Sequence, residues 1–108
     1  MRLIAIACVL LSLPSAALAQ QKENVDDWPK VRVGGKTCLA SHEHFGESRP
    51  WVTKKGAVAY AIREWESMTA WEYGKSWSNY RLAVGKRTSC KQAGGRWVCS
   101  TVARPCRR

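Results

Sequence analysis

The sequence predicts a small α+β domain of β-α-β-β order, in which one helix packs on an antiparallel sheet and the C-terminal hairpin carries a disulfide. Three features support this fold class. Apolar residues recur at helical spacing within residues 54–73, a Gly94-Gly95 pair separates two alternating segments, and four cysteines follow residue 19. With 108 residues, we expect one domain, which excludes a multidomain enzyme or a dinucleotide-binding α/β fold.

Residues 1–19 have the composition of a secretory signal peptide. Arg2 supplies the positive start, residues 3–13 are apolar and uncharged, and Ala17-Leu18-Ala19 places small residues at a cleavage site. The apolar run is too short for a membrane span, which needs about 20 residues. We therefore expect cleavage before Gln20, a periplasmic or secreted location, and no transmembrane segment in the remaining chain.

Export determines how the cysteines are interpreted. Removal of the signal peptide leaves an even set: Cys38, Cys90, Cys99 and Cys106. In a small exported domain this predicts two disulfides and no free thiol, with three possible pairings. A zinc site is the competing interpretation, but it requires closely paired cysteines, which these spacings do not supply.

The first part of the mature chain contains few strong signals. Residues 20–30 are polar and charged and predict a flexible N-terminal arm, followed by a single small disulfide-stabilised domain at residues 31–108. Residues 31–40 contain β-branched side chains and predict a strand, with a bulge or bend at Gly34-Gly35. Residues 41–50 have the composition of a loop.

A helix is predicted from about residue 54 to residue 73. Thr53 is suited to cap its N-terminus and Gly74 to end it. The apolar stripe consists of Val58, Ala61, Ile62, Trp65, Met68 and Thr69. We expect Trp65 and Met68 to pack in the core. After a connector at residues 75–79, residues 80–84 fit either the start of a strand or a short helix that begins at Ser78.

The hairpin of residues 86–92 and 96–103 can be aligned rung by rung. If Gly94-Gly95 forms a two-residue turn, Ala93 faces Arg96 in a hydrogen-bonded pair. Alternation then places Cys90 opposite Cys99 in a non-hydrogen-bonded pair, where side chains are close. This register favours a Cys90–Cys99 disulfide and leaves Cys38 to pair with Cys106.

The same register sorts the hairpin into two faces. The face expected to pack on the helix carries Thr88, Cys90, Gln92, Trp97, Cys99, Thr101 and Ala103. The opposite face carries Ser89, Val98, Ser100 and Val102 together with four cations and no acid. These candidate anion-binding residues are Arg87, Lys91, Arg96 and Arg104.

Charge is strongly segregated along the chain, whose formal net charge is +10. All eight acidic residues lie between Glu23 and Glu72, whereas residues 74–108 contain cations and no acid. Two interpretations remain open: a solvated face that keeps a small protein soluble, or a surface that binds anions.

One sequence pattern extends from the helix to the C-terminus. Its residues are Ala57, Ala61, Trp65, Tyr73-Gly74, Trp77, Ala83, Cys90, Cys99 and Pro105-Cys106. In this pattern the chain resembles a group of small, exported, cysteine-containing bacterial proteins. The resemblance implies a periplasmic or secreted protein and carries over no catalytic residues. The cysteine-rich C-terminal region with its Pro105-Cys106 pair is also similar to that of small envelope proteins with lectin-like behaviour.

His42-Glu43-His44 is the one cluster with the character of a metal site, because two histidines in an extended segment can bind Zn²⁺ or Cu²⁺. It lacks a third ligand nearby, so we favour a solvated loop and expect no metal site. The chain also lacks hydrolase, metalloprotease and phosphate-loop motifs, so we expect no enzyme and no cofactor.

We therefore expect an exported, non-enzymatic envelope or periplasmic protein. Its basic face would bind anionic envelope polymer, lipopolysaccharide or lipid head groups. The alternative is a carbohydrate- or peptide-binding, lectin-like module with aromatic stacking platforms at Trp71, Tyr73, Trp77 and Tyr80. A nucleic-acid ligand also fits basic residues interleaved with aromatics, but export makes it the least expected partner.

Overall fold

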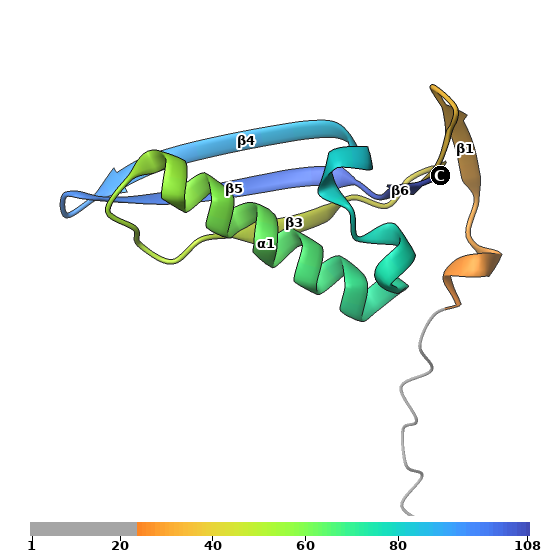
Figure 1. Cartoon of the computed structure of the whole chain (residues 1–108), viewed down its shortest axis with the longest axis horizontal. Coiled ribbons are helices and arrows are strands. Elements are labelled where there is room, and N and C mark those ends of the chain that lie inside the picture. Colours follow the sequence, from red (N-terminus) through yellow and green to blue (C-terminus); the bar gives the residue numbers. More distant parts are fainter. Residues whose placement is uncertain (1–23) are drawn as a thin grey trace, which may run out of the picture.

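The computed structural model describes residues 24–108, so the predicted signal peptide and the cleavage before Gln20 lie outside the described residues. One long helix, α1 (Lys54–Tyr73), accompanies two three-stranded antiparallel sheets (Figure 1). The first sheet has the order β1 (Lys30–Val33), β2 (Lys36–Leu39), β6 (Cys106–Arg107). The second has the order β3 (His44–Glu47), β5 (Arg96–Arg104), β4 (Val84–Ala93).

Helix α1 has the ends that the sequence predicts. The Thr53 hydroxyl accepts a hydrogen bond from the Gly56 amide at 3.0 Å, which satisfies one of the free donors in the first turn. At the other end Gly74 has φ +105°, a conformation that excludes most side chains and ends the helix. No helix within residues 24–108 is long and apolar enough to cross a membrane.

The buried side of α1 is narrower than the predicted stripe and rotated from it. The buried residues follow one another in steps of four: Ala57, Ala61, Trp65, Thr69 and Tyr73. The sequence predicts Met68 in the core, but the side chain is 46% exposed because it falls on the next face of the helix. Strand β3 approaches α1 so closely that a Cβ on Gly46 would collide with the helix backbone at Ala61 and Trp65.

The β4–β5 hairpin has the predicted register, with Ala93 opposite Arg96 and Cys90 opposite Cys99. Gly94 and Gly95 have φ of +59° and +77°, as a two-residue primed turn requires. Disulfides join Cys90 to Cys99 and Cys38 to Cys106, the pairing that this register favours.

The structure has more strands than the predicted β-α-β-β arrangement. These strands form two sheets instead of the single expected sheet. The expected strand at residues 31–40 is a hairpin, because Gly34-Gly35 is its two-residue turn rather than a bulge within one strand. The expected loop at residues 41–50 contains β3, which pairs with β5 through its backbone. These additional strands lie before α1 in the sequence.

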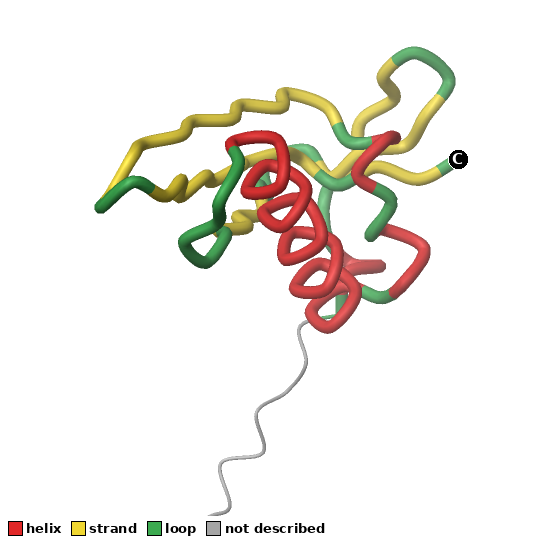
Figure 2. Tube along the Cα trace, turned by 60° about the vertical axis from the view of Figure 1, so that its left-hand side comes forward, coloured by secondary structure: helices red, strands yellow, loops and turns green. Residues whose placement is uncertain are grey.

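The expected flexible arm is packed where the structure describes it. Residues Val25–Asp27 form a 3-10 helix, η1, and Trp28 packs with Val25 against a buried cluster of Leu39, Tyr73 and Trp77. Between α1 and β4 the chain forms two further 3-10 helices, η2 (Lys75–Trp77) and η3 (Tyr80–Leu82), rather than a strand (Figure 2).

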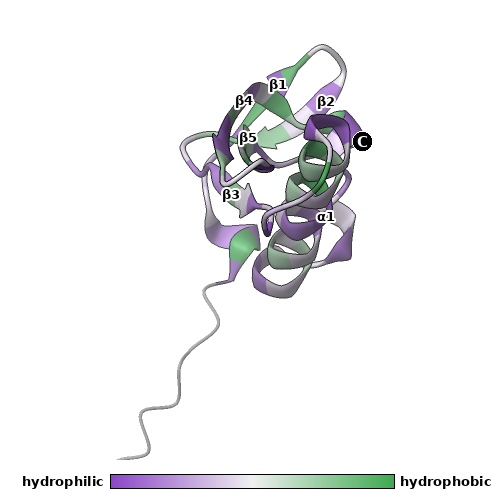
Figure 3. Cartoon of the chain, turned by 90° about the vertical axis from the view of Figure 1, so that its left-hand side faces the viewer, coloured by the Kyte–Doolittle hydropathy of each residue, from purple (hydrophilic) through white to green (hydrophobic). Residues whose placement is uncertain are grey.

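Helix α1 lies along one side of the β3–β5–β4 sheet, as the view from the hairpin end shows (Figure 3). The β5 residues on the helix side, Cys99, Thr101 and Ala103, are buried. Their neighbours along the strand, Val98, Ser100 and Val102, are half-buried and lie on the opposite side. The sheet therefore has one covered face and one open face, and the open face is the one with the predicted cations.

Candidate anion-binding face

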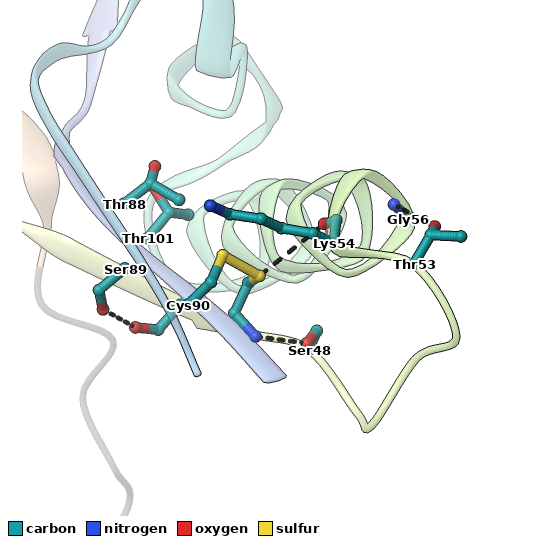
Figure 4. Close-up of a disulfide and its surroundings, with 10 residues drawn as sticks. Ser48, Thr53, Lys54, Gly56, Thr88, Ser89, Cys90 and Thr101 are labelled. Carbon is teal, nitrogen blue, oxygen red and sulfur yellow. Dashed lines mark hydrogen bonds between the residues drawn. A yellow bond between two sulfur atoms is a disulfide. The ribbon is translucent and has the colours of Figure 1, made fainter. Parts of the chain in front are cut away.

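We call the side of the β3–β5–β4 sheet that faces away from α1 the outer face. By strand alternation its residues are Phe45 and Glu47 from β3, Arg87, Ser89 and Lys91 from β4, and Arg96, Val98, Ser100, Val102 and Arg104 from β5. Figure 4 shows this division at two neighbouring rungs. The Cys90–Cys99 disulfide lies on the helix side, and Ser89 lies on the opposite side, where its hydroxyl oxygen is 3.1 Å from that of Ser100.

The backbone fixes the outer face in place because β5 is paired along both of its sides. Beyond the end of β3, the Ser48 amide donates to the Cys99 carbonyl at 2.8 Å, and the Cys99 amide donates to the Ser48 hydroxyl at 2.9 Å. Closer to the turn, Trp51 and Trp97 exchange two backbone hydrogen bonds of 2.8 and 2.7 Å. The strand that carries Arg96 and Arg104 is therefore held along its whole length.

The register brings all four predicted cations onto this face. Arg87, Lys91 and Arg96 are exposed, and Arg104 is half-buried. Arg96 and Arg104 are eight residues apart on β5, which corresponds to about 26 Å along an extended strand. The cations therefore form a spaced array, which suits a long anion with repeated charges better than a single small ion.

One of the four cations is already paired within the protein. Arg87 forms a forked ion pair with Glu43, with Nη2 2.7 Å from Oε2 and Nη1 3.0 Å from Oε1. The hydrogen bond from Arg87 lowers the pKa of Glu43, and the charges of Arg87 and Arg104 act in the same direction. The same hydrogen bond raises the pKa of Arg87.

The other three predicted cations make no ion pair within residues 24–108. Lys91 and Arg96 stand exposed near the hairpin turn. Arg104 is half-buried, and its Nε atom is buried without a hydrogen-bond partner. Each of these three side chains can therefore bind an external anion without first giving up an internal carboxylate.

Two acids also belong to this face, although the hairpin sequence predicts none there. Glu43 and Glu47 precede α1, within residues 20–73, where eight acidic residues balance eight lysines and arginines. The position of β3 beside β5 nevertheless brings these two acids to the outer face. No local signal marks the Glu43–Arg87 contact, because the two residues are 44 positions apart. Only the pairing of β3 with β5 could have revealed it.

Apolar side chains also lie on the outer face, between its charged groups. Phe45 is 52% exposed, its cross-strand partner Val102 is half-buried, and so is Val98 farther along β5. A hollow of about 300 Å³ lies over this region, lined by Phe45, Glu47, Ser89, Lys91, Val98 and Ser100 among others. A ligand on this face would meet apolar and hydroxyl groups as well as cations.

The four aromatic residues of the alternative stacking hypothesis are divided by the structure. Trp77 is 1% exposed, and Tyr73 and Tyr80 are each 9% exposed, so three of the four rings belong to the core. Arg107 covers the Trp77 ring at 4.5 Å, and the Tyr80 hydroxyl bonds to Thr101 at 2.7 Å. Trp71 alone of the four is open, at 71% exposure, beside a pocket of about 430 Å³ at the C-terminal end of α1.

The two histidines have separate partners. The His42 ring stacks on Trp28 with centroids 3.7 Å apart, whereas His44 Nε2 lies 2.6 Å from Glu72 Oε2. Within residues 24–108 no group of three or more His, Cys, Asp or Glu side chains is placed to hold a metal ion. The expected solvated loop at His42-Glu43-His44 is instead bonded to its surroundings, since Glu43 also binds Arg87.

Comparisons of this chain with protein-family models, with curated proteins and with solved structures gave no match.

Proposed function

We propose that the protein is an exported, non-enzymatic component of the periplasm or cell envelope whose outer face binds an anionic envelope component. The ligand classes are an anionic polymer, lipopolysaccharide, or lipid head groups. The observation that carries this proposal is the array of Lys91, Arg96 and Arg104, three cations on one face that form no ion pair in the described chain. Exposed cations in such an array attract polyanions strongly at low ionic strength.

The two disulfides support the location. Disulfide bonds form and persist in oxidising compartments such as the periplasm and the extracellular space. Both pairs, Cys38–Cys106 and Cys90–Cys99, stabilise strands of this small chain, and the second lies directly behind the outer face.

The test is a charge reversal on the outer face. We expect Lys91→Glu with Arg96→Glu to abolish retention on immobilised heparin or lipopolysaccharide at about 0.15 M salt, where exposed charges are partly screened. The fold should persist, because exposed charges contribute roughly 0–1 kcal/mol each to stability. Thermal unfolding of the double variant checks the fold independently of binding.

The matched control changes the same number of charges elsewhere in the acid-free part of the chain. Lys75 and Arg81 are both exposed and lie in the 3-10 helices, away from the outer face. Lys36 is a less suitable control position, because its ammonium group donates a hydrogen bond to the Leu82 carbonyl at 2.9 Å and its reversal would also break that contact. If Lys75→Glu with Arg81→Glu weakens retention as much as the outer-face variant, attraction depends on net charge alone and the proposal fails.

The carbohydrate- or peptide-binding alternative now depends on Trp71. Stacking on a sugar or peptide needs an open ring, and Tyr73, Trp77 and Tyr80 are buried. Salt separates the two hypotheses, because binding through cations weakens steeply with ionic strength. Retention that persists at high salt and disappears in Trp71→Ala would favour the alternative.

A further inference from the structure

Strand β4 is a long open edge of the sheet. Its ten residues, Val84–Ala93, pair with β5 on one side and with no strand of the described chain on the other. Nearly every residue in β4 is exposed. In Figures 1 and 2 the strand runs along the border of the molecule, with no described segment beside its free side.

The register identifies which backbone groups point outward from this edge. In antiparallel pairing, residues of hydrogen-bonded pairs direct their N–H and C=O groups at the partner strand, and the residues between them direct theirs away. Ala93 pairs with Arg96 next to the turn, so Thr88, Cys90 and Gln92 are the outward residues. No other segment within residues 24–108 bonds to their backbone groups.

Charge decides what kind of strand can occupy the edge. Edge strands are commonly protected by charged residues that discourage pairing, and β4 carries Lys86, Arg87 and Lys91 without any acid. Lys86 lies over the Tyr80 ring at 5.1 Å and Arg87 is held by Glu43, whereas Lys91 has no partner in the described chain. A second copy of β4 would place like charges side by side, which is unfavourable. An acidic strand would meet opposite charges.

We propose that the open edge of β4 binds an acidic polypeptide segment in extended conformation, by strand addition. The segment's main chain bonds to Thr88, Cys90 and Gln92, and its carboxylates lie on the outer face beside Lys91 and Arg87. Strand addition derives affinity from main-chain hydrogen bonds and specificity from alternate side chains. This site goes beyond the proposed binding of envelope anions, because it recognises a backbone as well as charge.

The test uses a synthetic peptide of five Thr-Glu repeats with blocked ends, titrated into the disulfide-bonded protein at about 0.15 M salt. Two further peptides carry N-methyl groups, one on every Thr nitrogen and the other on every Glu nitrogen. All three have the same charge. With the Glu side chains on the outer face, Thr nitrogens point at β4 in an antiparallel complex, and Glu nitrogens do so in a parallel one.

We expect the unmodified peptide to bind and one methylated peptide to lose about tenfold or more in affinity, because its hydrogen bonds to the edge are blocked. Loss of affinity in the peptide methylated on Thr nitrogens would indicate an antiparallel strand, and loss in the peptide methylated on Glu nitrogens a parallel one. Equal binding of all three peptides would overturn the proposal, since attraction would then depend on charge alone. Absence of binding, or an equal loss with both methylated peptides, would overturn it as well.

A matched pair of protein variants tests the same edge from the other side. Gln92 is exposed and its N–H points outward, so Gln92→Pro removes one edge donor without removing a bond to β5. Gln92→Ala keeps that donor. We expect only the proline variant to lose peptide affinity, while both keep the heparin retention of wild type. Analytical ultracentrifugation checks whether the edge binds a second copy of the chain instead. A wild-type dimer that is absent in Gln92→Pro would assign the edge to a second copy and overturn the proposal.

Discussion

At the scale of single residues, Trp65 connects α1 to both of the strands beneath it. The side chain is fully buried, and its indole Nε1 donates to the carbonyl oxygens of His44 at 2.9 Å and Ala103 at 3.2 Å. Its ring meets Tyr80 edge to face with centroids 5.3 Å apart. One side chain therefore fills the core and bonds to β3 and β5 at the rung where these two strands pair.

We expect Trp65→Ala to reduce the free energy of unfolding by about 3–5 kcal/mol, because it leaves a large cavity in the core. Met68→Ala is the control from the same helix, and it should cost less than about 1 kcal/mol because Met68 is 46% exposed. Urea unfolding of both variants measures the difference. Similar losses for the two variants would contradict the observed orientation of α1.

Glu43 restrains one cation of the outer face, so its removal should strengthen anion binding. Glu43→Gln breaks the ion pair with Arg87 and adds a free cation to the array. Glu47→Gln makes the same change in net charge on the same face but breaks no ion pair in the described chain. We expect the Glu43 variant to elute from heparin at a higher salt concentration than the Glu47 variant. Equal elution would mean that Arg87 takes no part in binding.

This difference should depend on pH in a definite direction. The pKa of Glu43 is lowered from its ordinary value of 4.5, chiefly by the hydrogen bond from Arg87. The ion pair is therefore formed at pH values above the ordinary pKa of a glutamate, and it is lost as the pH falls through the lowered pKa of Glu43. Protonation frees Arg87 just as Glu43→Gln does, so wild type and the Glu43 variant should converge in acid.

At the scale of elements, the sequence is informative where a signal is local. Helix α1 has its cap, its buried spacing and its terminal glycine within one continuous segment, and the β4–β5 hairpin follows from Gly94-Gly95 and the alternation beside it. The same Gly-Gly signal occurs at Gly34-Gly35. There the sequence predicts only a bulge or bend within one strand, because the strands beside it have four residues each, too few to show clear alternation.

Strand β3 could not be predicted in this way. Its sequence, His-Phe-Gly-Glu, is short and has only one large apolar side chain, and it is extended because its backbone pairs with β5. Gly46 matters there for its lack of a side chain, which lets β3 touch α1. The candidate site divides along the same line: the cations follow from the hairpin register, whereas the Glu43 partner depends on the contact between β3 and β5.

At the scale of the whole molecule, charge segregation along the chain is not the same as segregation in space. The chain folds so that β2 pairs with β6 and β3 pairs with β5. Each pair joins a strand from residues 20–73, where the charges balance, to a strand from the acid-free residues 74–108. Glu43 and Glu47 therefore lie beside the basic strands. Lys91 and Arg96 stay free because they lie near the turn of the hairpin, beyond the end of β3.

The two disulfides differ in how much of the chain they close, and this difference predicts their contributions to stability. Cys38–Cys106 spans 68 residues, including α1 and the whole β3–β5–β4 sheet, whereas Cys90–Cys99 spans 9 residues within one hairpin. In the chain-entropy description, the longer loop restricts the unfolded state more, which gives about 4.4 kcal/mol for the first disulfide and about 2.6 kcal/mol for the second.

We therefore expect Cys38→Ala with Cys106→Ala to destabilise the protein more than Cys90→Ala with Cys99→Ala. Urea unfolding of the two double variants measures the two losses.

Packing changes accompany both, since Cys38, Cys99 and Cys106 are all buried, so the difference between the variants is more informative than either loss. The hairpin is also held by its glycine turn and by the bonds of β5 to Ser48 and Trp51, which persist without its disulfide. An equal or larger loss in the hairpin variant would mean that Cys90–Cys99 stabilises the folded sheet itself, rather than only restricting the unfolded chain.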